Sequence, residues 1–405
     1  MALPFVAILV LGSGPIEIAV LRSMDVAATL VFGLVAGAWV DRLRRRPVLI
    51  WADLGRGILL GSIPIAYVGG WLSFGQLVVV AGLAAILSTF FDAADNAYLP
   101  TIVERERLVE ANSALAASGS AAEFTGFGIS GVLIQVLTAP IAILVDSLTF
   151  LASALLLGTI RAPEPPPPPL EAREPVVTEI RRGLALVVRD PILRPYALAQ
   201  MAHAAGWGFF GATFLLFAVD DLGLGAAAIG IIAGVGGLAS FAGAVVATRT
   251  TRRYGIGHTS IVSMTVAAIG GVFIPLAPAG APLVAIVFLV AQQLVADSAA
   301  TVFDVSETAV RQSLVNEREL GRVTATFRVA AGLAQLCTTL VGGLLGAAIG
   351  LRAVLFLGPI VMLGGAVLLW RSPVRSLFEL PTGELPEPDA AVVVVEIGRD
   401  EPIGG

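Results

Sequence analysis

The amino-acid sequence consists mainly of long apolar stretches separated by short polar segments. A hydrocarbon core about 30 Å thick is crossed by roughly 20 residues of α-helix, and in lipid every backbone polar group must find a partner within such a helix. Twelve stretches are present: residues 2–12, 23–40, 48–69, 74–97, 113–137, 140–160, 195–218, 225–248, 259–278, 282–304, 323–346 and 350–370. The pattern predicts an all-α integral membrane protein.

The composition argues against several other classes of protein. Apolar residues make up 57% of the chain and charged residues 14%, whereas soluble domains carry about 25% charged residues. A net charge of −5 provides no basic surface for nucleic acid. The single cysteine, Cys337, and the two histidines, His203 and His258, are too few for a disulfide or a metal cluster. We therefore expect no nucleic-acid partner and no bound metal.

The first stretch is shorter than a membrane span. Residues 2–12 would rise only about 17 Å as a helix, at ~1.5 Å per residue. A basic segment does not precede them, which argues against a signal peptide. The first helix is therefore expected to be truncated, with its beginning missing.

The basic residues are distributed unequally between the two sets of loops. All 25 are arginine, and nearly all lie on the side that holds the loop after the second stretch. Arg22 and Arg352 lie in the opposite loops, and Arg56 and Arg328 lie within stretches. Because cytoplasmic loops are enriched in basic residues, the arginine-rich side and the C-terminus are predicted to be cytoplasmic.

A proline-rich loop divides the chain into two halves. Residues 161–194 begin with a run of prolines, which favours an extended linker, and continue with an amphipathic helical pattern. The predicted domains are a six-helix bundle over 1–160 with an incomplete first helix, the cytoplasmic linker over 161–194, a second six-helix bundle over 195–371, and a flexible cytoplasmic tail over 372–405.

The two halves carry similar sequences between corresponding stretches. Val103–Leu108 reads Val-Glu-Arg-Glu-Arg-Leu, and Val315–Leu320 reads Val-Asn-Glu-Arg-Glu-Leu. An acidic pair precedes each of them: Asp92 with Asp95, and Asp304 with Glu307. A repeated set of six membrane segments is typical of a duplicated transporter with its binding site between the halves.

An arginine-rich loop follows the second stretch and reads Gly37-Ala38-Trp39-Val40-Asp41-Arg42-Leu43-Arg44-Arg45-Arg46-Pro47. Glycine lets a neighbouring helix approach closely. An aspartate at the membrane edge suits the positive N-terminus of an opposing helix, and arginines are attracted to anionic lipid. Taken alone, the loop is also compatible with a purely topological role.

This loop resembles the signature loop of the major facilitator superfamily, which joins helices two and three. The resemblance implies the major facilitator fold, two six-helix bundles around a central cavity. It also implies that the loop latches the halves together when the carrier opens outward. The conformational-gating residues would then be Gly37, Asp41, Arg42, Arg45 and Arg46.

Further segments resemble one branch of that superfamily, the branch with the enterobactin exporter and the macrolide and multidrug efflux carriers. The similarity rests on residues 41–50, 98–112 and 146–150. The chain departs from the drug–proton antiporters in its fifth stretch, where Phe127 stands in place of a proline. The fourth stretch also lacks the intramembrane arginine of many such antiporters. Glycines remain in the fifth stretch and are predicted to support helix packing and bending: Gly126, Gly128 and Gly131.

Two carboxylates lie deep within the stretches. Glu123 is in the fifth stretch and Asp297 is in the tenth, and ionisable groups at membrane depth are candidate functional groups. A carboxylate that takes up a proton facing outward and releases it facing inward would couple transport to protons. Both are therefore candidates for proton coupling in the central cavity, with a helix-packing hydrogen bond as the alternative.

Three residues of the seventh stretch fall on one helical face. Gln200, His203 and Trp207 follow helical spacing, and this mixture of polar and aromatic groups suits an amphipathic organic substrate. A packed helix–helix face is the alternative. Simpler roles are expected for other charges: pairing of Asp53 with Arg56, interfacial anchoring by Arg22 and Asp25, a structural Asp146, contact of Asp92 and Asp95 with the arginine loop, and pairing of Arg328 with Asp297, Asp304 or Glu307.

These observations lead to one preferred function and two alternatives. The preferred function is export of a hydrophobic or amphipathic small molecule from a bacterium, by alternating access and proton antiport. The carrier is expected to be monomeric in the cytoplasmic membrane, with lipid, substrate and protons as partners and no cofactor. Because no phosphate-binding loop, nucleophile–histidine pair or HExxH motif occurs, enzyme activity is not expected. The alternatives are a metabolite uniporter or importer of the same fold and a non-transporting remnant.

Overall fold

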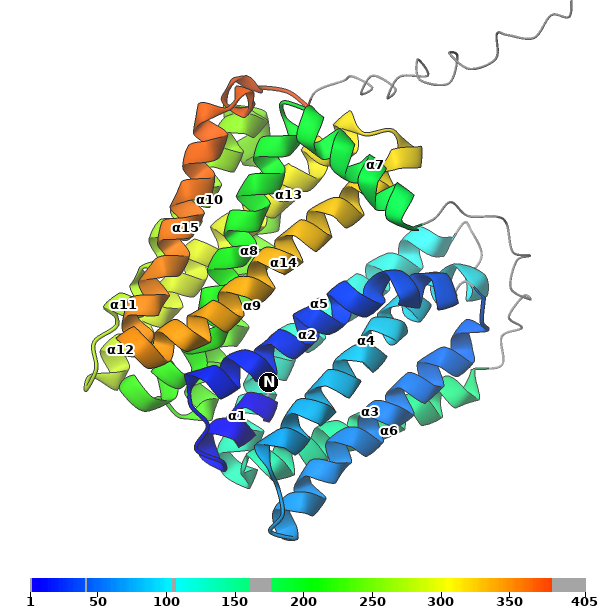
Figure 1. The fold of residues 1–405 in the computed structure, drawn as a ribbon, viewed down its shortest axis with the longest axis vertical. Coiled ribbons are helices and arrows are strands. Elements are labelled where there is room, and N and C mark those ends of the chain that lie inside the picture. Colours follow the sequence, from blue (N-terminus) through cyan, green and yellow to red (C-terminus); the bar gives the residue numbers. More distant parts are fainter. Residues whose placement is uncertain (1, 41, 104–106, 161–175, 381–405) are drawn as a thin grey trace, which may run out of the picture.

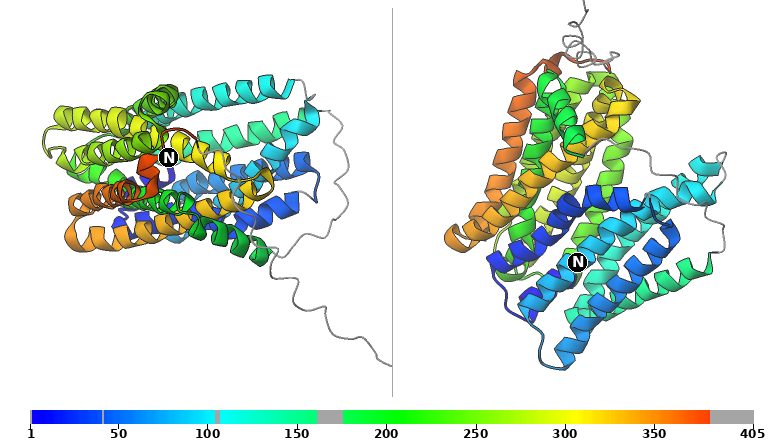
Figure 2. Two further views of the ribbon diagram at one scale, coloured as in Figure 1. Left: turned by 90° about the horizontal axis from the view of Figure 1, so that it is seen from above. Right: turned by 45° about the vertical axis from the view of Figure 1, so that its right-hand side comes forward.

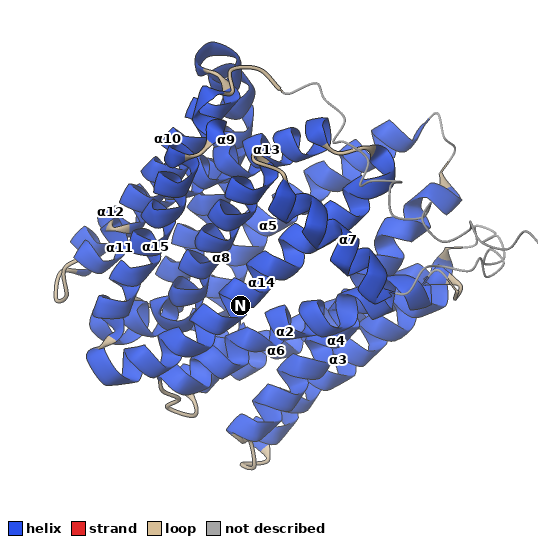
Figure 3. Cartoon of the chain, turned by 45° about the horizontal axis from the view of Figure 1, so that its top comes forward, coloured by secondary structure: helices blue, strands red, loops and turns tan. Residues whose placement is uncertain are grey.

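The structure is a computed structural model that describes residues 2–40, 42–103, 107–160 and 176–380 of the 405-residue chain. Every regular element in these ranges is a helix (Figure 3). Nine of the described helices are long and apolar enough to cross a membrane. The predicted all-α membrane fold is therefore confirmed.

The helices form two bundles, which lie side by side in Figure 1 and in the two further views of Figure 2. The N-terminal bundle contains α1 (Ala2–Leu9), α2 (Pro15–Val40), α3 (Arg45–Val68), α4 (Phe74–Ile102), α5 (Leu108–Leu137) and α6 (Ala139–Thr159). The second helix thus begins well before the predicted residue 23. The eight residues of α1 pack against α6, α2 and α4.

The C-terminal bundle contains helices that are interrupted in two membrane segments. Its members are α8 (Leu193–Leu216), α9 (Ala226–Tyr254), α10 (Ile256–Gly271), α11 (Phe273–Leu276), α12 (Pro282–Gln292), α13 (Ser298–Leu314), α14 (Glu317–Ile349) and α15 (Leu351–Arg371). A π-helical turn, η2 (Phe217–Asp221), extends α8, and another, η3 (Gln293–Asp297), joins α12 to α13. Single π-turns inside α-helices occur frequently at functional sites.

The internal repeat extends to the backbone conformation. Thr138 joins α5 to α6 with a positive φ of 78°, and Gly350 joins α14 to α15 with a φ of 90°. The same sequence separation relates Thr138 to Gly350, Val103 to Val315 and Asp92 to Asp304. For a threonine this backbone conformation is unusual, so the shared one-residue turn supports a common origin of the two halves.

The two most extensive helix contacts between the bundles, α5 with α9 and α2 with α14, both cross at glycine. A Cβ at Gly131 on α5 would lie 2.5 Å from the carbonyl oxygen of Ala226 on α9. A Cβ at Gly230 on α9 would lie 2.5 Å from the carbonyl oxygen of Phe127 on α5. On α14, a Cβ at Gly343 would lie 2.9 Å from the carbonyl oxygen of Pro15 on α2. Gly131 and Gly343 occupy equivalent positions of the repeat, so the two crossings are related by its symmetry.

The bundles share a core at one end only. At the end opposite the arginine-rich loops, buried apolar side chains from both bundles form one cluster, which includes Phe5, Leu21, Ile134, Phe217 and Leu355. At the arginine-rich end each bundle has a separate core, one around Phe303 and Leu369 and one around Leu49 and Tyr98. The structure is therefore closed at the opposite end, and the described residues of its two halves share no core at the arginine-rich end.

A buried ion pair holds α3, α4 and α6 together in the N-terminal bundle. Arg56 forms an ion pair with Asp53, as predicted, and donates a hydrogen bond to Ser88 Oγ at 3.1 Å. Its guanidinium lies 4.4 Å from the ring centroid of Phe91 and 4.5 Å from that of Phe150. A charge buried in a membrane protein requires such partners, so this pair has a structural role.

The segment between the bundles contains α7 (Val176–Arg189), which packs on the C-terminal bundle. A Cβ at Gly183 would lie 2.8 Å from the carbonyl oxygen of Arg322 on α14, and Val187 is buried. Residues 161–175 of the predicted linker lie outside the described residues.

The predicted flexible tail over 372–405 requires a correction in its first part. A 3-10 turn, η4 (Pro373–Ser376), follows α15. The N–H groups of Ile256 and Gly257 donate to the carbonyl oxygens of Phe378 and Leu377 at 3.1 and 2.9 Å. This segment therefore satisfies N–H groups at the beginning of α10, which have no partner within their own helix. Residues 381–405 lie outside the described part of the chain.

The glycine crossing of α5 and α9 provides a matched pair of variants. We expect Gly131→Ala to lower the stability of the protein, because its methyl group would contact backbone that cannot move aside. Overpacking of this kind costs about 1–3 kcal/mol. Gly128→Ala serves as the control, since no described atom lies within 4 Å of its Cβ position and alanine favours helix by about 1 kcal/mol. The measurement is the thermal unfolding midpoint in detergent, and equal midpoints for the two variants would contradict the crossing.

Candidate functional site

A large cavity lies between the two bundles. Its volume is about 730 Å³, and it is lined by α2 from the N-terminal bundle and by α8, α13 and α14 from the C-terminal bundle. Cavities of roughly 300–1,000 Å³ accommodate drug-sized ligands. We call it the central cavity.

The predicted substrate residues of the seventh stretch all line the central cavity. Gln200, His203 and Trp207 project from α8 into it. The side-chain oxygen of Gln200 is buried and has no hydrogen-bond partner in the structure. A buried acceptor without a partner is costly, so this oxygen is available to accept a hydrogen bond from a ligand.

His203 lines the central cavity and also contacts three neighbouring side chains. Its Nε2 accepts a hydrogen bond of 3.1 Å from the indole N–H of Trp207, and its Nδ1 lies 3.6 Å from an Asp304 carboxylate oxygen. Phe303 packs edge-on against the imidazole, with centroids 5.8 Å apart. Because Nε2 accepts, these contacts assign the proton of a neutral His203 to Nδ1.

A second ion pair lies in the wall of the central cavity. Arg311 donates to Glu307 Oε1 at 3.1 Å, and the Thr308 hydroxyl lies 3.4 Å from the other Glu307 oxygen. The Arg311 guanidinium is also 5.1 Å from the ring centroid of Phe327. The pair brings two compensated charges to the cavity wall.

Two more charged residues face the central cavity from opposite bundles. Asp25 lines it from α2 and Arg328 from α14, and both are exposed. The prediction that Asp25 anchors the outer interface is therefore wrong. Because α2 begins at Pro15, Asp25 lies several turns inside the helix.

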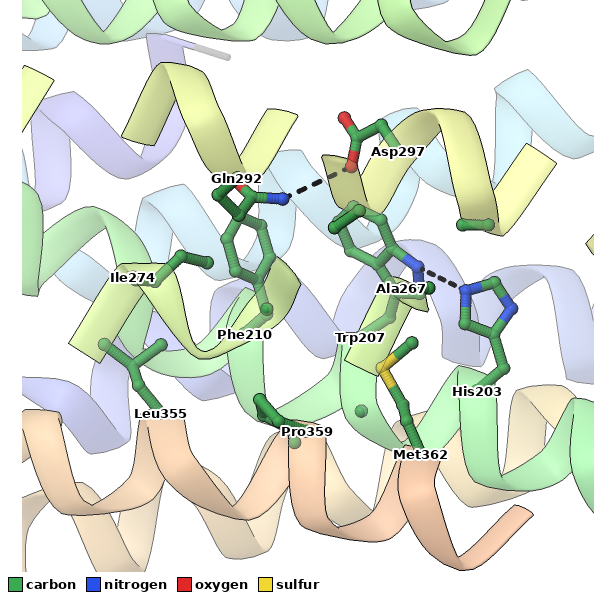
Figure 4. A pocket seen from close by; sticks show the side chains of 15 residues that line it. His203, Trp207, Phe210, Ala267, Ile274, Gln292, Asp297, Leu355, Pro359 and Met362 are labelled. Atoms are coloured by element: carbon green, nitrogen blue, oxygen red, sulfur yellow. Dashed lines mark hydrogen bonds between the residues drawn. The ribbon is translucent and has the colours of Figure 1, made fainter. Parts of the chain in front are cut away.

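A smaller pocket lies inside the C-terminal bundle (Figure 4). Its volume is about 50 Å³, and it is lined by residues from α8, α10, α12, α13 and α15. Asp297 lines this pocket, where it accepts a 3.4 Å hydrogen bond from the amide of Gln292. Asp297 was expected in the central cavity, but it does not line that cavity, so this expectation is corrected.

The π-turn η3 explains this arrangement. Gln292 and Asp297 are five residues apart, a spacing that one wide turn places on the same face of the helix. His203 and Trp207 line both the pocket and the central cavity. They therefore form the wall that separates Asp297 from the space between the bundles.

The other candidate coupling residue, Glu123, lies on α5, but its side chain is outside the described part of the structure. The repeat relates Glu123 to Gln335, which lines the central cavity.

The three glycines of the fifth stretch are not equivalent. Gly131 packs against α9, whereas no described atom lies within 4 Å of the Cβ position at Gly126 or Gly128. Close packing therefore explains Gly131, whereas a role of Gly126 and Gly128 in helix bending stays a prediction.

The predicted gating loop is only partly described. Asp41 lies outside the described residues, and Arg42 is exposed. Arg46 donates to the carbonyl oxygens of Leu157, at 3.0 Å, and Gly158 at the end of α6. No described atom lies within 4 Å of a Cβ at Gly37, so the expected close helix approach is absent from this conformation. Arg45 lies in the first turn of α3.

Two features of the site were missed by the analysis of the sequence. The Glu307–Arg311 pair has the i, i+4 spacing of a helical ion pair, but it lies beyond residue 304, where the apolar stretch ends, although the helix continues to Leu314. The π-turn that aligns Gln292 with Asp297 has no signal in apolar periodicity. It depends on how α12 and α13 pack in the bundle.

Two helical bundles with a ligand-sized cavity between them define a membrane transporter of the alternating-access type. The Major Facilitator Superfamily model matches residues 1–303 and 197–401. The chain therefore belongs to the major facilitator superfamily.

Relatives of this chain include transporters of different kinds. The uncharacterized MFS-type transporter YceJ of Bacillus subtilis is 27% identical over 235 residues, 58% of this chain and 57% of YceJ. The multidrug efflux pump Tap of Mycolicibacterium fortuitum is 30% identical over 178 residues, 42% of this chain and 44% of Tap. The chain thus matches about half the length of these curated relatives.

A solved structure is similar over a larger part of the chain. The crystal structure of the nucleoside transporter NupG superposes with a TM-score of 0.71 at 15% identity, covering 91% of this chain and 94% of NupG. At this identity the similarity concerns the fold.

The separated cores at the arginine-rich end predict one-sided access to the central cavity. In a Cys337→Ser background, we expect Thr308→Cys on the cavity wall to react with a membrane-impermeant thiol reagent in inside-out vesicles. Leu21→Cys, in the shared core at the opposite end, is the control and should remain at least tenfold less reactive from either side. Preferential labelling of Thr308→Cys in right-side-out vesicles would contradict this orientation.

Proposed function

We propose that this protein exports a hydrophobic or amphipathic small molecule across the bacterial cytoplasmic membrane in exchange for protons. The observation that carries the proposal is the central cavity of about 730 Å³, which combines ionisable side chains from both bundles with aromatic side chains from the C-terminal bundle. The partial similarity of the chain to the multidrug efflux pump Tap supports the same function.

The distribution of charge and the shape of the structure support this direction. The arginine-rich end is assigned to the cytoplasm by the positive-inside rule, which also places the C-terminus there. The described conformation has its shared core at the other end. A carrier in this state would load its substrate from the cytoplasm, as an exporter must.

The cavity wall suits an amphipathic cargo. Trp207 offers aromatic surface, and Gln200 offers a buried acceptor without a partner. Asp25 and Asp304 add carboxylates that can face a polar or cationic part of the cargo. A phosphorylated substrate would instead favour a clamp of several arginines. Two arginines line the cavity, and of these Arg311 is already paired with Glu307, which leaves Arg328.

Alternating access would proceed by rocking the bundles about the glycine crossings. In the outward-open state the shared core must separate and the arginine-rich ends must come together. We assign Gly37, Asp41, Arg42, Arg45 and Arg46 to the latch that holds the arginine-rich ends in that state. Arg46, which is bound to the end of α6, fixes the loop to its own bundle.

Proton coupling is assigned to His203 and Asp297, with Glu123 as the corresponding candidate in the N-terminal bundle. A proton added to Nε2 of His203 removes the acceptor for the Trp207 indole, because both nitrogens of imidazolium are donors. It also strengthens the attraction between His203 and Asp304, which lies 3.6 Å away. Trp207 would then be free to move, and Asp297 behind it would gain contact with the central cavity.

The first test of this proposal is proton release in energised inside-out vesicles. Addition of macrolides, dyes or siderophores should release protons from vesicles with the wild-type protein. Asp297→Asn and Glu123→Gln should reduce this release tenfold or more, because the amide cannot carry the exchanged proton. Asp146→Asn on α6 is the control, since this exposed carboxylate lies outside the central cavity, and it should leave proton release unchanged.

The assay distinguishes the proposal from its alternatives. Release that persists in both variants would retain the antiporter but reject these two coupling residues. Substrate movement without proton release would favour a uniporter, and accumulation against the proposed direction would favour an importer. A correctly inserted protein that moves none of the compounds would contradict the exporter.

The second test concerns the contact between His203 and Trp207. We expect acidification to change Trp207 fluorescence, because protonation of His203 removes the indole hydrogen bond. His203→Gln should abolish most of the change. His258→Gln is the matched control, since the chain has two histidines and His258 lines neither the central cavity nor the small pocket. Trp207→Phe identifies the signal, and an unchanged response in His203→Gln would reject the switch.

A further inference from the structure

A third cavity, which we call the α9–α10 groove, lies on the side of the C-terminal bundle. Its volume is about 750 Å³, and its walls are residues 239–254 of α9 and 258–266 of α10, with Leu294, residues 298–302 and Phe378 completing it. It shares no lining residue with the central cavity or the small pocket. The groove is therefore separate from the proposed transport path.

The groove is apolar along most of its length. Val246, Val262 and Leu294 line it and are 43%, 57% and 52% exposed. The backbones of α9 and α13 meet at its base, where a Cβ at Gly243 would collide with the carbonyl oxygen of Ser298. Since these walls belong to membrane-crossing helices, an alkyl chain is the natural occupant of this part.

One wall of the groove contains a polar group without a partner. Thr259 is only 6% exposed, and its hydroxyl has no hydrogen-bond partner in the structure. Threonine in a helix commonly bonds a carbonyl of the preceding turn. An orphaned buried hydroxyl is costly, and here it is positioned to bond a polar atom of a molecule in the groove.

The mouth of the groove lies at the arginine-rich end and is basic. Tyr254 and His258 line it, and the Arg253 guanidinium is 5.4 Å from the ring centroid of Tyr254. Arg249 and Arg252 belong to the last turns of the same helix. The adjoining C-terminal segment adds one charge of each sign, Arg375 and Glu379. The mouth therefore carries an excess of positive charge.

We propose that the α9–α10 groove binds one anionic phospholipid from the leaflet at the arginine-rich end. The phosphate lies at the mouth beside Arg253 and His258, and an acyl chain follows the apolar wall formed by Val246 and Val262. The Thr259 hydroxyl donates to a phosphate or ester oxygen. Basic pockets between membrane helices on this side of the bilayer are suited to anionic headgroups.

The test is native mass spectrometry of the full chain in detergent. The protein is titrated with phosphatidylglycerol or with phosphatidylcholine of the same acyl chains, which carries the same phosphate but no net charge. We expect the first phosphatidylglycerol to bind several-fold more tightly. Arg253→Gln should weaken this binding about fivefold, the loss expected for one basic residue near an anionic surface, and should leave phosphatidylcholine binding unchanged.

Two further variants separate the site from general effects of charge and lipid. Arg107→Gln removes an exposed arginine of the other bundle that is paired with Glu110, and this variant should bind phosphatidylglycerol as the wild type does. Val262→Trp should fill the groove and abolish the preference without affecting assembly, as judged by the unfolding midpoint. Equal affinity for both lipids, or equal behaviour of Arg253→Gln and Arg107→Gln, would overturn the proposal.

The same experiment can identify a different occupant. Suppose that a dye no longer binds to Val262→Trp but still binds to Trp207→Ala, and that the protein binds the two lipids with equal affinity. The groove would then be an entrance for cargo. That result would overturn the lipid site and leave the proposed export function intact.

Discussion

The contact on which this structure depends is the close crossing of helices from opposite bundles at glycine. Lipid is as apolar as leucine, so helices in a membrane associate through close packing and not through the hydrophobic effect. Gly131 and Gly343 allow α5 to meet α9 and α14 to meet α2 at backbone distance. Both crossings lie near the end where the bundles share a core. The other end is consequently free to open, and the central cavity lies between the diverging helices.

The polar groups inside the bundles follow a second constraint. A charge buried away from water is stable only with partners, and the structure supplies them differently in the two halves. In the N-terminal bundle, Asp53, Arg56 and two aromatic rings form a compact unit away from the cavity. In the C-terminal bundle, Glu307 with Arg311 and His203 with Asp304 lie on the cavity wall. Among the described residues, these charged pairs are thus placed differently in the two halves, away from the cavity in the first and on its wall in the second.

Much of the fold could be predicted because a helix that spans a membrane must be long and apolar. Length and apolarity identified the helical segments, and the repeated Val103–Leu108 and Val315–Leu320 motifs identified the duplication. The i, i+3 pairing of Asp53 with Arg56 and the shared face of Gln200, His203 and Trp207 follow from helical geometry. Helix boundaries were less accurate: α2 begins at Pro15, which moves Asp25 from the interface into the cavity.

By itself, the sequence determined that this protein is a helical membrane transporter with two related halves, since span length, repeat and loop charge are all local properties of the chain. Only the tertiary structure decided what each polar residue faces. The π-turn that pairs Gln292 with Asp297, and the wall of His203 and Trp207 that separates Asp297 from the central cavity, depend on how several helices pack together. A side chain at a given depth can face lipid, a partner helix or a cavity, and that choice is set by rotations of helices that hydropathy does not encode.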